Sequence, residues 1–224
     1  MTSDYEVHVV RTTSQWGNYC YIVEDLFTKS AFIVDPAWEL DQICNKLSEL
    51  QVTLTAILLT HSHYDHVNLV YPLVERFNAT VYMAAKERDY YQFSCPRLIG
   101  LNDNDTIRIG NTNITCLLTP GHTAGGMCYL LEESLFSGDT VFTEGCGICN
   151  QEGGSADDMF ISFQRMKSVI PPHVRVYPGH SFGKAPGQTM EYLLQTNIYF
   201  LIENRDHFVN FRMRKNQPFT PAIF

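Results

Sequence analysis

A cluster of histidines beside a short apolar run constrains this chain more than any other feature of its sequence. Residues 56–59 read Ala-Ile-Leu-Leu, the length of a buried strand, and the chain soon continues as His-Ser-His-Tyr-Asp-His. Imidazole and carboxylate groups are ligands that suit zinc, iron or manganese. Because a turn after a strand lets side chains converge, we expect His61 and His63 to reach one metal ion. Asp65 and His66 can turn toward a second.

Three further candidate ligands lie downstream, each directly after a glycine that lets the backbone bend where a strand ends. They are His122, Asp139 and His180. Any one of these histidines alone would more often be structural, but the whole set fits two metal sites that share a water or hydroxide. The remaining histidines have no such setting, and we expect them to be structural or solvated: His8, His173 and His207.

The order of the predicted elements indicates the fold class. Strands are predicted over 6–11, 19–24, 30–34, 55–60, 80–83, 106–109, 113–118, 127–131, 134–137 and 175–177. Helices are predicted over 40–50, 68–77, 86–91 and 188–203, and another begins at the capping sequence Ser-Ala-Asp-Asp of residues 155–158. This order predicts an α/β fold with two halves, each a sheet with helices outside it. Since no linker or repeat is visible, we expect a single domain over residues 1–224.

The HxHxDH motif, with the later Gly-His, Gly-Asp and Gly-His pairs, resembles the metallo-β-lactamase superfamily over almost the whole chain. The resemblance implies an αββα four-layer sandwich and two divalent metal ions, most simply Zn²⁺. It also implies the ligand sets: His61, His63 and His122 for the first metal, Asp65, His66 and His180 for the second, and Asp139 bridging both. Asp65 would in addition act in catalysis by orienting the attacking water.

The likeness extends to one branch of that superfamily. Residues 138–142 and the Gly-Cys-Gly of residues 145–147 resemble the glyoxalase II group, which hydrolyses glutathione thioesters. His66 argues against β-lactam cleavage, because the lactam-cleaving members usually carry another residue there. Three features depart from the group. Ile148 replaces a basic residue that helps to hold glutathione, residues 181–184 lack the acidic residue and tyrosine usual after the last metal histidine, and the chain stops before the helical glutathione-binding domain.

Three segments carry a narrower resemblance: residues 16–21, 144–149 and 208–217. They are similar to zinc-dependent hydrolases of bacillaene-type, trans-acyltransferase polyketide gene clusters. This resemblance implies a thioester hydrolase that releases acyl groups from acyl carrier proteins, with the phosphopantetheine thioester as substrate. Two alternatives stay open: a hydroxyacylglutathione hydrolase of the glyoxalase II type, and an iron persulfide dioxygenase on the same fold.

Composition narrows the choice of partners and compartment. The formal net charge of -8 disfavours a nucleic-acid partner. We expect no membrane span, because no run reaches the ~18 apolar residues that one needs. The N-terminus is polar and acidic, which is unlike a secretory signal. An odd number of cysteines, seven, favours reduced thiols and a cytoplasmic protein.

Two local features remain open to more than one interpretation. The basic residues of the tail, 212–215, and Lys184 beside the last candidate ligand are candidates to bind the phosphate of phosphopantetheine or an acidic carrier protein. The alternative for the tail is a solvated segment without a partner. Cys146 and Cys149 form a CxxC pair, which we interpret as reduced thiols near the mouth of the site rather than a redox or zinc pair.

Overall fold

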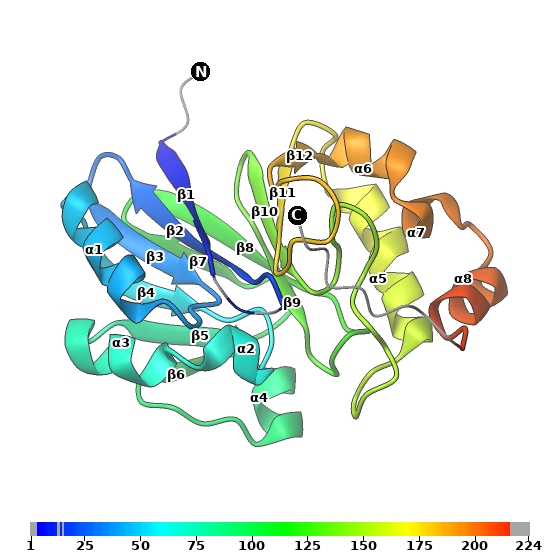
Figure 1. Cartoon of the computed structure of the whole chain (residues 1–224), viewed down its shortest axis with the longest axis horizontal. Helices are drawn as coiled ribbons and strands as arrows, with labels where there is room; N and C mark the ends of the chain where they lie inside the picture. The colour runs from blue at the N-terminus through cyan, green and yellow to red at the C-terminus, as the bar shows by residue number, and fades with distance from the viewer. Residues whose placement is uncertain (1–3, 13, 15, 216–224) are drawn as a thin grey trace.

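Two six-stranded sheets form the centre of the molecule in this computed structural model, which describes residues 4–12, 14 and 16–215 (Figure 1). The first sheet has the spatial order β1 (Tyr5–Arg11), β2 (Tyr19–Asp25), β3 (Ser30–Val34), β4 (Thr53–Leu58), β5 (Thr80–Ala84), β6 (Leu98–Leu101). The second has the order β12 (Gln188–Thr189), β11 (Arg175–Pro178), β10 (Ser134–Gly138), β9 (Met127–Leu130), β8 (Thr112–Leu118), β7 (Thr106–Ile109).

Helices cover the outer sides of both sheets. On the first half lie α1 (Leu40–Leu50), α2 (Tyr64–Val67), α3 (Val70–Phe77) and α4 (Ala85–Tyr91) (Figure 1). On the second lie α5 (Ala156–Val169), α6 (Met190–Thr196), α7 (Ile198–Leu201) and α8 (Arg205–Arg212). The predicted αββα sandwich is therefore confirmed. No helix in the described part of the chain is long and apolar enough to cross a membrane.

Three apolar cores separate the four layers, and strand β2 shows how one strand serves two of them. Tyr21 and Val23 belong to the core between the sheets, whereas Cys20 and Ile22 belong to the core beneath α1 and α3. Successive side chains of a strand point to opposite faces, so a strand buried on both faces needs apolar residues at nearly every position. All seven residues of β2 are buried, and the first five are apolar or aromatic.

The predicted start of the fifth helix is confirmed in detail. Ser155 caps α5, and its hydroxyl accepts a hydrogen bond from the backbone N–H of Asp158 at 3.1 Å. The helix buries Met159, Phe163 and Met166, which recur at helical spacing, against the second sheet and the later helices.

Some elements differ from the prediction. Strands β6 and β12 and helix α8 were not predicted, and the helix predicted over 68–77 is preceded by the short helix α2. The single helix predicted over 188–203 is wrong, because Asn197 is extended and divides it into α6 and α7. Its side chain accepts a bond from the N–H of Tyr199, while its amide nitrogen donates to the carbonyl oxygens of Phe142 and Gly145. These bonds outweigh the continuous helical pattern.

The candidate ligands lie at one edge of the two sheets for a topological reason. Strands β3 and β4 run parallel, as do β10 and β11, so the carboxyl ends of each pair meet at the same edge. Asp35 and His61 follow the first pair, and Asp139 and His180 follow the second. An isolated bridge between Asn18 and His180 joins the two halves at this edge.

Candidate metal centre

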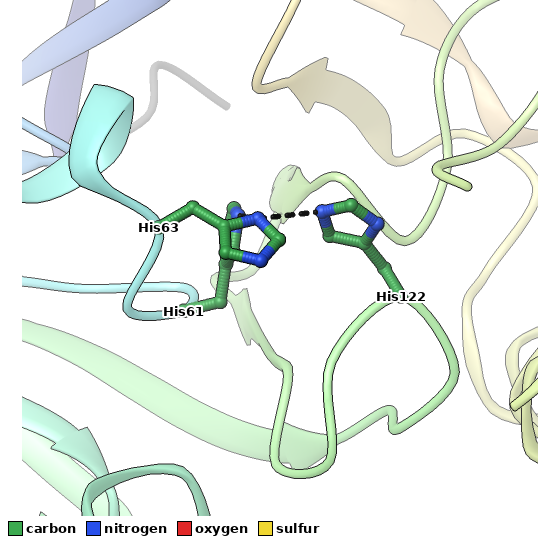
Figure 2. Close-up of side chains that lie close together, drawn as sticks. All are labelled: His61, His63 and His122. Atoms are coloured by element: carbon green, nitrogen blue, oxygen red, sulfur yellow. Dashed lines mark hydrogen bonds between the residues drawn. The ribbon is translucent and has the colours of Figure 1, made fainter. Parts of the chain in front are cut away.

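Three histidines from two loops form the first group of ligand atoms. The Nδ1 atom of His63 lies 3.1 Å from Nε2 of His61 and 3.0 Å from Nε2 of His122 (Figure 2). His61 and His63 come from the loop after β4, and His122 comes from the loop after β8. The structure thus brings together the three residues expected at the first metal.

The second group contains a carboxylate and two histidines. The Nε2 atoms of His66 and His180 are 3.2 Å apart. The Oδ2 atom of Asp65 lies 3.6 Å from the first of these nitrogens and 3.4 Å from the second. These are the three residues expected at the second metal, and they also lie within reach of a single ion.

Asp139 lies between the two groups, as the bridging role requires. Its Oδ1 atom is 3.5 Å from Nε2 of His66, and its Oδ2 atom is 3.5 Å from Nε2 of His122 and 3.3 Å from Nε2 of His180. Oδ1 is buried and accepts no hydrogen bond from any residue that the structure describes. A buried carboxylate oxygen without a donor is costly unless a cation faces it.

The spacing of the ligand atoms fits bound metal ions. Nitrogen ligands about 2.0–2.1 Å from a tetrahedral zinc ion stand roughly 3.3 Å from one another. The contacts within the two groups measure 3.0 to 3.6 Å.

The outward nitrogens of the rings have their own partners, which fixes the tautomers. Nδ1 of His122 lies 2.7 Å from the carbonyl oxygen of Ile148, and Nδ1 of His180 lies 3.0 Å from that of Trp16. A ring that donates through Nδ1 presents an unprotonated Nε2 to the site. Several such lone pairs converge here, and a shared cation removes the repulsion between them.

Burial keeps the histidines of the first group in the neutral form that metal binding requires. It lowers the pKa of His61 well below its usual value, and the neighbouring His66 lowers it further. The pKa values of His63 and His122 are also lowered, again mainly by burial. These rings can therefore bind a metal at neutral pH without first losing a proton.

The second group, in contrast to the neutral first group, contains ionised side chains. Burial lowers the pKa of His66, but the carboxylates of Asp139 and Asp35 outweigh it and raise that pKa to about 9. Burial raises the pKa of Asp139, yet His180 and His66 outweigh it and hold the carboxyl well below its usual range. At neutral pH His66 therefore holds a proton beside the ionised carboxylates of Asp65 and Asp139, and a metal ion must displace that proton.

Asp35 supports this centre and was not predicted from the sequence. Its Oδ2 atom lies 3.0 Å from Nδ1 of His66 and accepts a bond from the hydroxyl of Thr60, while Oδ1 accepts from the backbone N–H of Thr60. Asp35 therefore orients one ligand and fixes the residue before another, His61. The available signal was an Asp-Pro pair directly after the strand that neighbours β4.

Glu87 is a second residue that sequence reasoning missed. It lies on α4 and is fully buried, and it accepts bonds from the N–H and hydroxyl of Ser62 and from the N–H of Gly125. It thereby connects the loop of His61 and His63 with the loop that follows His122. Nothing in the sequence around position 87 distinguishes it from a solvated helix residue.

Asn18 holds Asp65 in place. Its side-chain amide donates to both the backbone oxygen and Oδ2 of Asp65, each at 3.0 Å. Its own oxygen accepts from the hydroxyl of Ser14 and from the indole N–H of Trp38. The residue lies in the segment 16–21 that carried part of the sequence resemblance, and the structure gives it a physical role.

The CxxC segment lies against the first group of ligands. The N–H of Gly147 donates to the backbone oxygen of Asp139, and Ile148 supplies the carbonyl oxygen that His122 contacts. All seven cysteines of the chain are free thiols, as expected. Cys146 and Cys149 lie in a segment beside the site, and both residues are buried. Burial raises the pKa of Cys146 to about 12, so its thiol is unreactive at neutral pH.

The histidines expected to lie outside the site do so. His8 contacts the carboxylate of Glu24 at 3.3 Å on the first sheet, and His173 and His207 are exposed.

Arg212 is placed differently from the prediction. It does not belong to an exposed basic tail, because it is only 6% exposed and packs inside the second half. Arg214 and Lys215 are exposed, and the tail from residue 216 onward lies outside the described residues.

The family profile of the metallo-beta-lactamase superfamily matches residues 14–180. With the αββα sandwich and the converging ligands, this match shows that the chain belongs to the metallo-β-lactamase superfamily, as its sequence resemblance indicated.

Individual proteins of known name are similar to this chain over most of its length. The chain is 63% identical to the probable polyketide biosynthesis zinc-dependent hydrolase PksB of Bacillus subtilis, over 97% of each chain. It is 62% identical to the corresponding protein BaeB of Bacillus velezensis, again over 97% of each. A probable hydroxyacylglutathione hydrolase of Schizosaccharomyces pombe is 31% identical over 92% of this chain and 82% of its own.

Solved structures agree with this placement. The crystal structure of ETHE1 from Myxococcus xanthus has a TM-score of 0.86 and 26% identity, covering 95% of this chain and 92% of that one. The structure of TTHA1623 in a di-iron-bound form has a TM-score of 0.71 and 28% identity, covering 85% of this chain and 98% of that one.

Proposed function

We propose that this protein is a dinuclear metal-dependent thioester hydrolase that releases acyl groups from acyl carrier proteins in polyketide biosynthesis. The convergence of all seven candidate ligands on two adjacent groups carries the proposal of a metal centre. The relatives support the reaction class. Two of them are named probable polyketide biosynthesis zinc-dependent hydrolases, and the more distant relative is named a probable hydroxyacylglutathione hydrolase, after a thioester substrate.

In this proposal two zinc ions occupy the site. His61, His63 and His122 would hold the first, Asp65, His66 and His180 would hold the second, and Asp139 lies between the two groups. Such ions lower the pKa of a water and polarise a carbonyl group when they are bound. The neutral first group and the carboxylate-rich second group together suit a pair of cations.

Asp65 orients the attacking water in addition to its role as a ligand. Its carboxylate is a quarter exposed, more than that of the buried Asp139, so it lies on the open side of the centre. Burial raises the pKa of this carboxyl, but His66 and the hydrogen bond from Asn18 to Oδ2 outweigh it and lower the pKa. Asp65 therefore stays an acceptor that can hold the proton of the attacking water.

The thiolate leaving group does not require a proton donor from the protein. A thiol has a pKa of about 8.5, so a thiolate departs without a strong general acid. The thiols of the CxxC pair are buried and have raised pKa values, so we assign them no part in the reaction.

The substrate arm, phosphopantetheine, carries one phosphate that needs a cation. Lys184 is exposed and lies four residues after His180, and its ammonium group stands 4.6 Å from the ring centre of Tyr192. The hydroxyl of Thr143 donates to the carbonyl oxygens of Phe182 and Lys184 and so fixes this loop. We assign the phosphate to Lys184, and we assign the contact with the acidic carrier protein to the exposed Arg214 and Lys215.

The test offers one acyl group on three carriers: an acyl carrier protein, a short pantetheine mimic and glutathione. The zinc-loaded enzyme is expected to release the acyl group from the first two quickly and from glutathione slowly. Asp65→Ala should lose the activity on all three, and Asp89→Ala, an exposed carboxylate on α4, should keep it.

The same experiment decides between the alternatives. A preference for glutathione would return the protein to the glyoxalase II type. Bound-metal analysis and oxygen uptake test the other alternative, an iron persulfide dioxygenase, which would show one iron and consume oxygen. Two zinc ions without oxygen uptake are expected instead.

A further inference from the structure

An exposed pair of aromatic side chains stands beside the candidate metal centre. The rings of Trp38 and Tyr64 meet edge to face, with centroids 5.8 Å apart and an interplanar angle of 76°. The two residues are 39% and 71% exposed, respectively. Single exposed aromatic side chains are common, but two rings in contact beside the candidate ligands form a small continuous apolar surface at the site.

Both residues are tied to the second group of ligands. Tyr64 lies in the chain between His63 and Asp65. The indole N–H of Trp38 donates to Oδ1 of Asn18 at 3.2 Å, and the amide of Asn18 donates to Oδ2 of Asp65. The aromatic pair is therefore one hydrogen-bonded residue away from the carboxylate that orients the water.

The backbone at Trp38 is strained, with φ at +67°. The left-handed region is unfavourable for a bulky side chain, and strained residues cluster where a protein contacts its ligand. The N–H of Trp38 donates to the side chain of Asn68 at 2.9 Å, which holds the residue in this conformation. The fold thus holds Trp38 in an unfavourable conformation while its side chain stays partly exposed beside the site.

We propose that Trp38 and Tyr64 form the subsite that binds the apolar acyl chain of the thioester, an inference that rests on the proposed function. The polar edge of the indole is already used by Asn18, so the pair offers ring surface to an apolar group. The exposed cation Lys184 lies in the separate loop after His180. The charged end of the substrate and its acyl chain are thus assigned to different loops around the centre.

The test compares acetyl and octanoyl thioesters of one pantetheine mimic with the zinc-loaded enzyme. The variants are Tyr64→Ala and Trp38→Gly, because glycine accepts the positive φ without strain. Phe27→Ala is the matched control, since Phe27 is 70% exposed in the β2–β3 turn at the other end of the strands. Loss of an apolar ring contact should lower the octanoyl-to-acetyl ratio of kcat/KM about tenfold.

A second measurement is independent of turnover. The chain has two tryptophans, so Trp16→Phe leaves Trp38 as the reporter of binding by fluorescence. An S-octyl pantetheine thioether, which cannot be hydrolysed, should change the emission of Trp38, and an S-methyl thioether should not.

The outcomes separate the two proposals. The acyl subsite would be overturned if the octanoyl-to-acetyl ratio of kcat/KM stays unchanged in both variants, whether or not the two activities fall together. An absent fluorescence response to the S-octyl thioether would also overturn it. The proposed function would stand in either case. Failure of the wild-type enzyme to hydrolyse either thioester would overturn the proposed function and the subsite together. A ratio that falls in both variants and not in the Phe27 control supports the subsite.

Discussion

The guanidinium of Arg212 donates a hydrogen bond to the carbonyl oxygen of Cys146 at 3.2 Å, across 66 positions of the chain. The same nitrogen donates to the hydroxyl of Tyr199 at 3.1 Å. The two residues after Cys146 contact the metal centre, through the backbone oxygen of Asp139 and the ring of His122. Helix α8 therefore supports the ligands of the first group through a short chain of hydrogen bonds.

Arg212→Met should weaken both the fold and the first metal group. The change removes a buried charged donor and leaves the carbonyl of Cys146 unpaired, which costs about 2–3 kcal/mol. We expect this loss in urea unfolding of the metal-free protein, and weaker zinc binding in a chelator competition. Arg214→Met, at an exposed position, is the control. An equal loss in both variants would show that the contact with Cys146 has no special importance.

Asp35→Asn should loosen the second metal. The carboxylate accepts from Nδ1 of His66, and replacing such a partner of a ligating histidine lowers metal affinity about 10- to 100-fold. Zinc titration should then show one tight and one weakened site. Asp105→Asn removes a charged acceptor that bonds the N–H of Asn102 in a remote turn, and it should leave both sites intact. Two unchanged affinities in Asp35→Asn would contradict the assigned role.

The sequence identified the candidate ligands that the fold brings together but not the residues that support them, for a physical reason. His61, His63 and Asp65 are recognisable because consecutive metal ligands must fit one turn, and that spacing is local. Asp35 and Glu87 act on residues 25 or more positions away, so only the tertiary structure reveals them.

The C-terminal helices show the same limit for the fold. The apolar pattern of residues 188–203 predicts one helix, but the side-chain bonds of Asn197 to the loop at Phe142 interrupt it. Arg212 looks like part of a basic surface until α8 buries it against Cys146. The strands and the αββα order were predictable because the patterns of apolar and polar residues that mark a buried strand involve residues close together in the sequence.

The stability of the fold depends on pH through the carboxyl group of Asp25. Burial raises the pKa of its carboxyl, but bonds from Thr28, Thr112 and Asn111 outweigh it and lower the pKa to about 2. Because the folded value lies below the unfolded one, the charged group contributes about 2 kcal/mol above pH ~4 and loses it as the pH falls toward about 2. Asp25→Asn should thus lose stability at pH 7, and its difference from wild type should shrink by roughly half near pH 3.

Urea unfolding at several pH values checks this expectation, with the exposed Asp41→Asn as the control. A difference between wild type and Asp25→Asn that stays constant from pH 7 to pH 3 would show that the hydrogen bonds do not act through the charge.

Glu87→Gln should affect both loops that carry the first metal group. The carboxylate accepts three hydrogen bonds, from the N–H and hydroxyl of Ser62 and from the N–H of Gly125. An amide keeps the shape but turns one acceptor into a donor, so at least one buried N–H loses its partner at a cost of about 1–3 kcal/mol. Glu75→Gln, at an exposed position on α3, should cost almost nothing.

Zinc affinity distinguishes a role of Glu87 in positioning the ligand loops from a purely structural role. If Glu87 positions the ligand loops, Glu87→Gln should bind zinc more weakly at the site of His61, His63 and His122 and should regain part of its stability when zinc is added in excess, since a ligand that binds only the folded state stabilises it. A variant that is destabilised but binds both zinc ions as tightly as wild type would restrict Glu87 to packing. The two loops would then be held by the sheets alone.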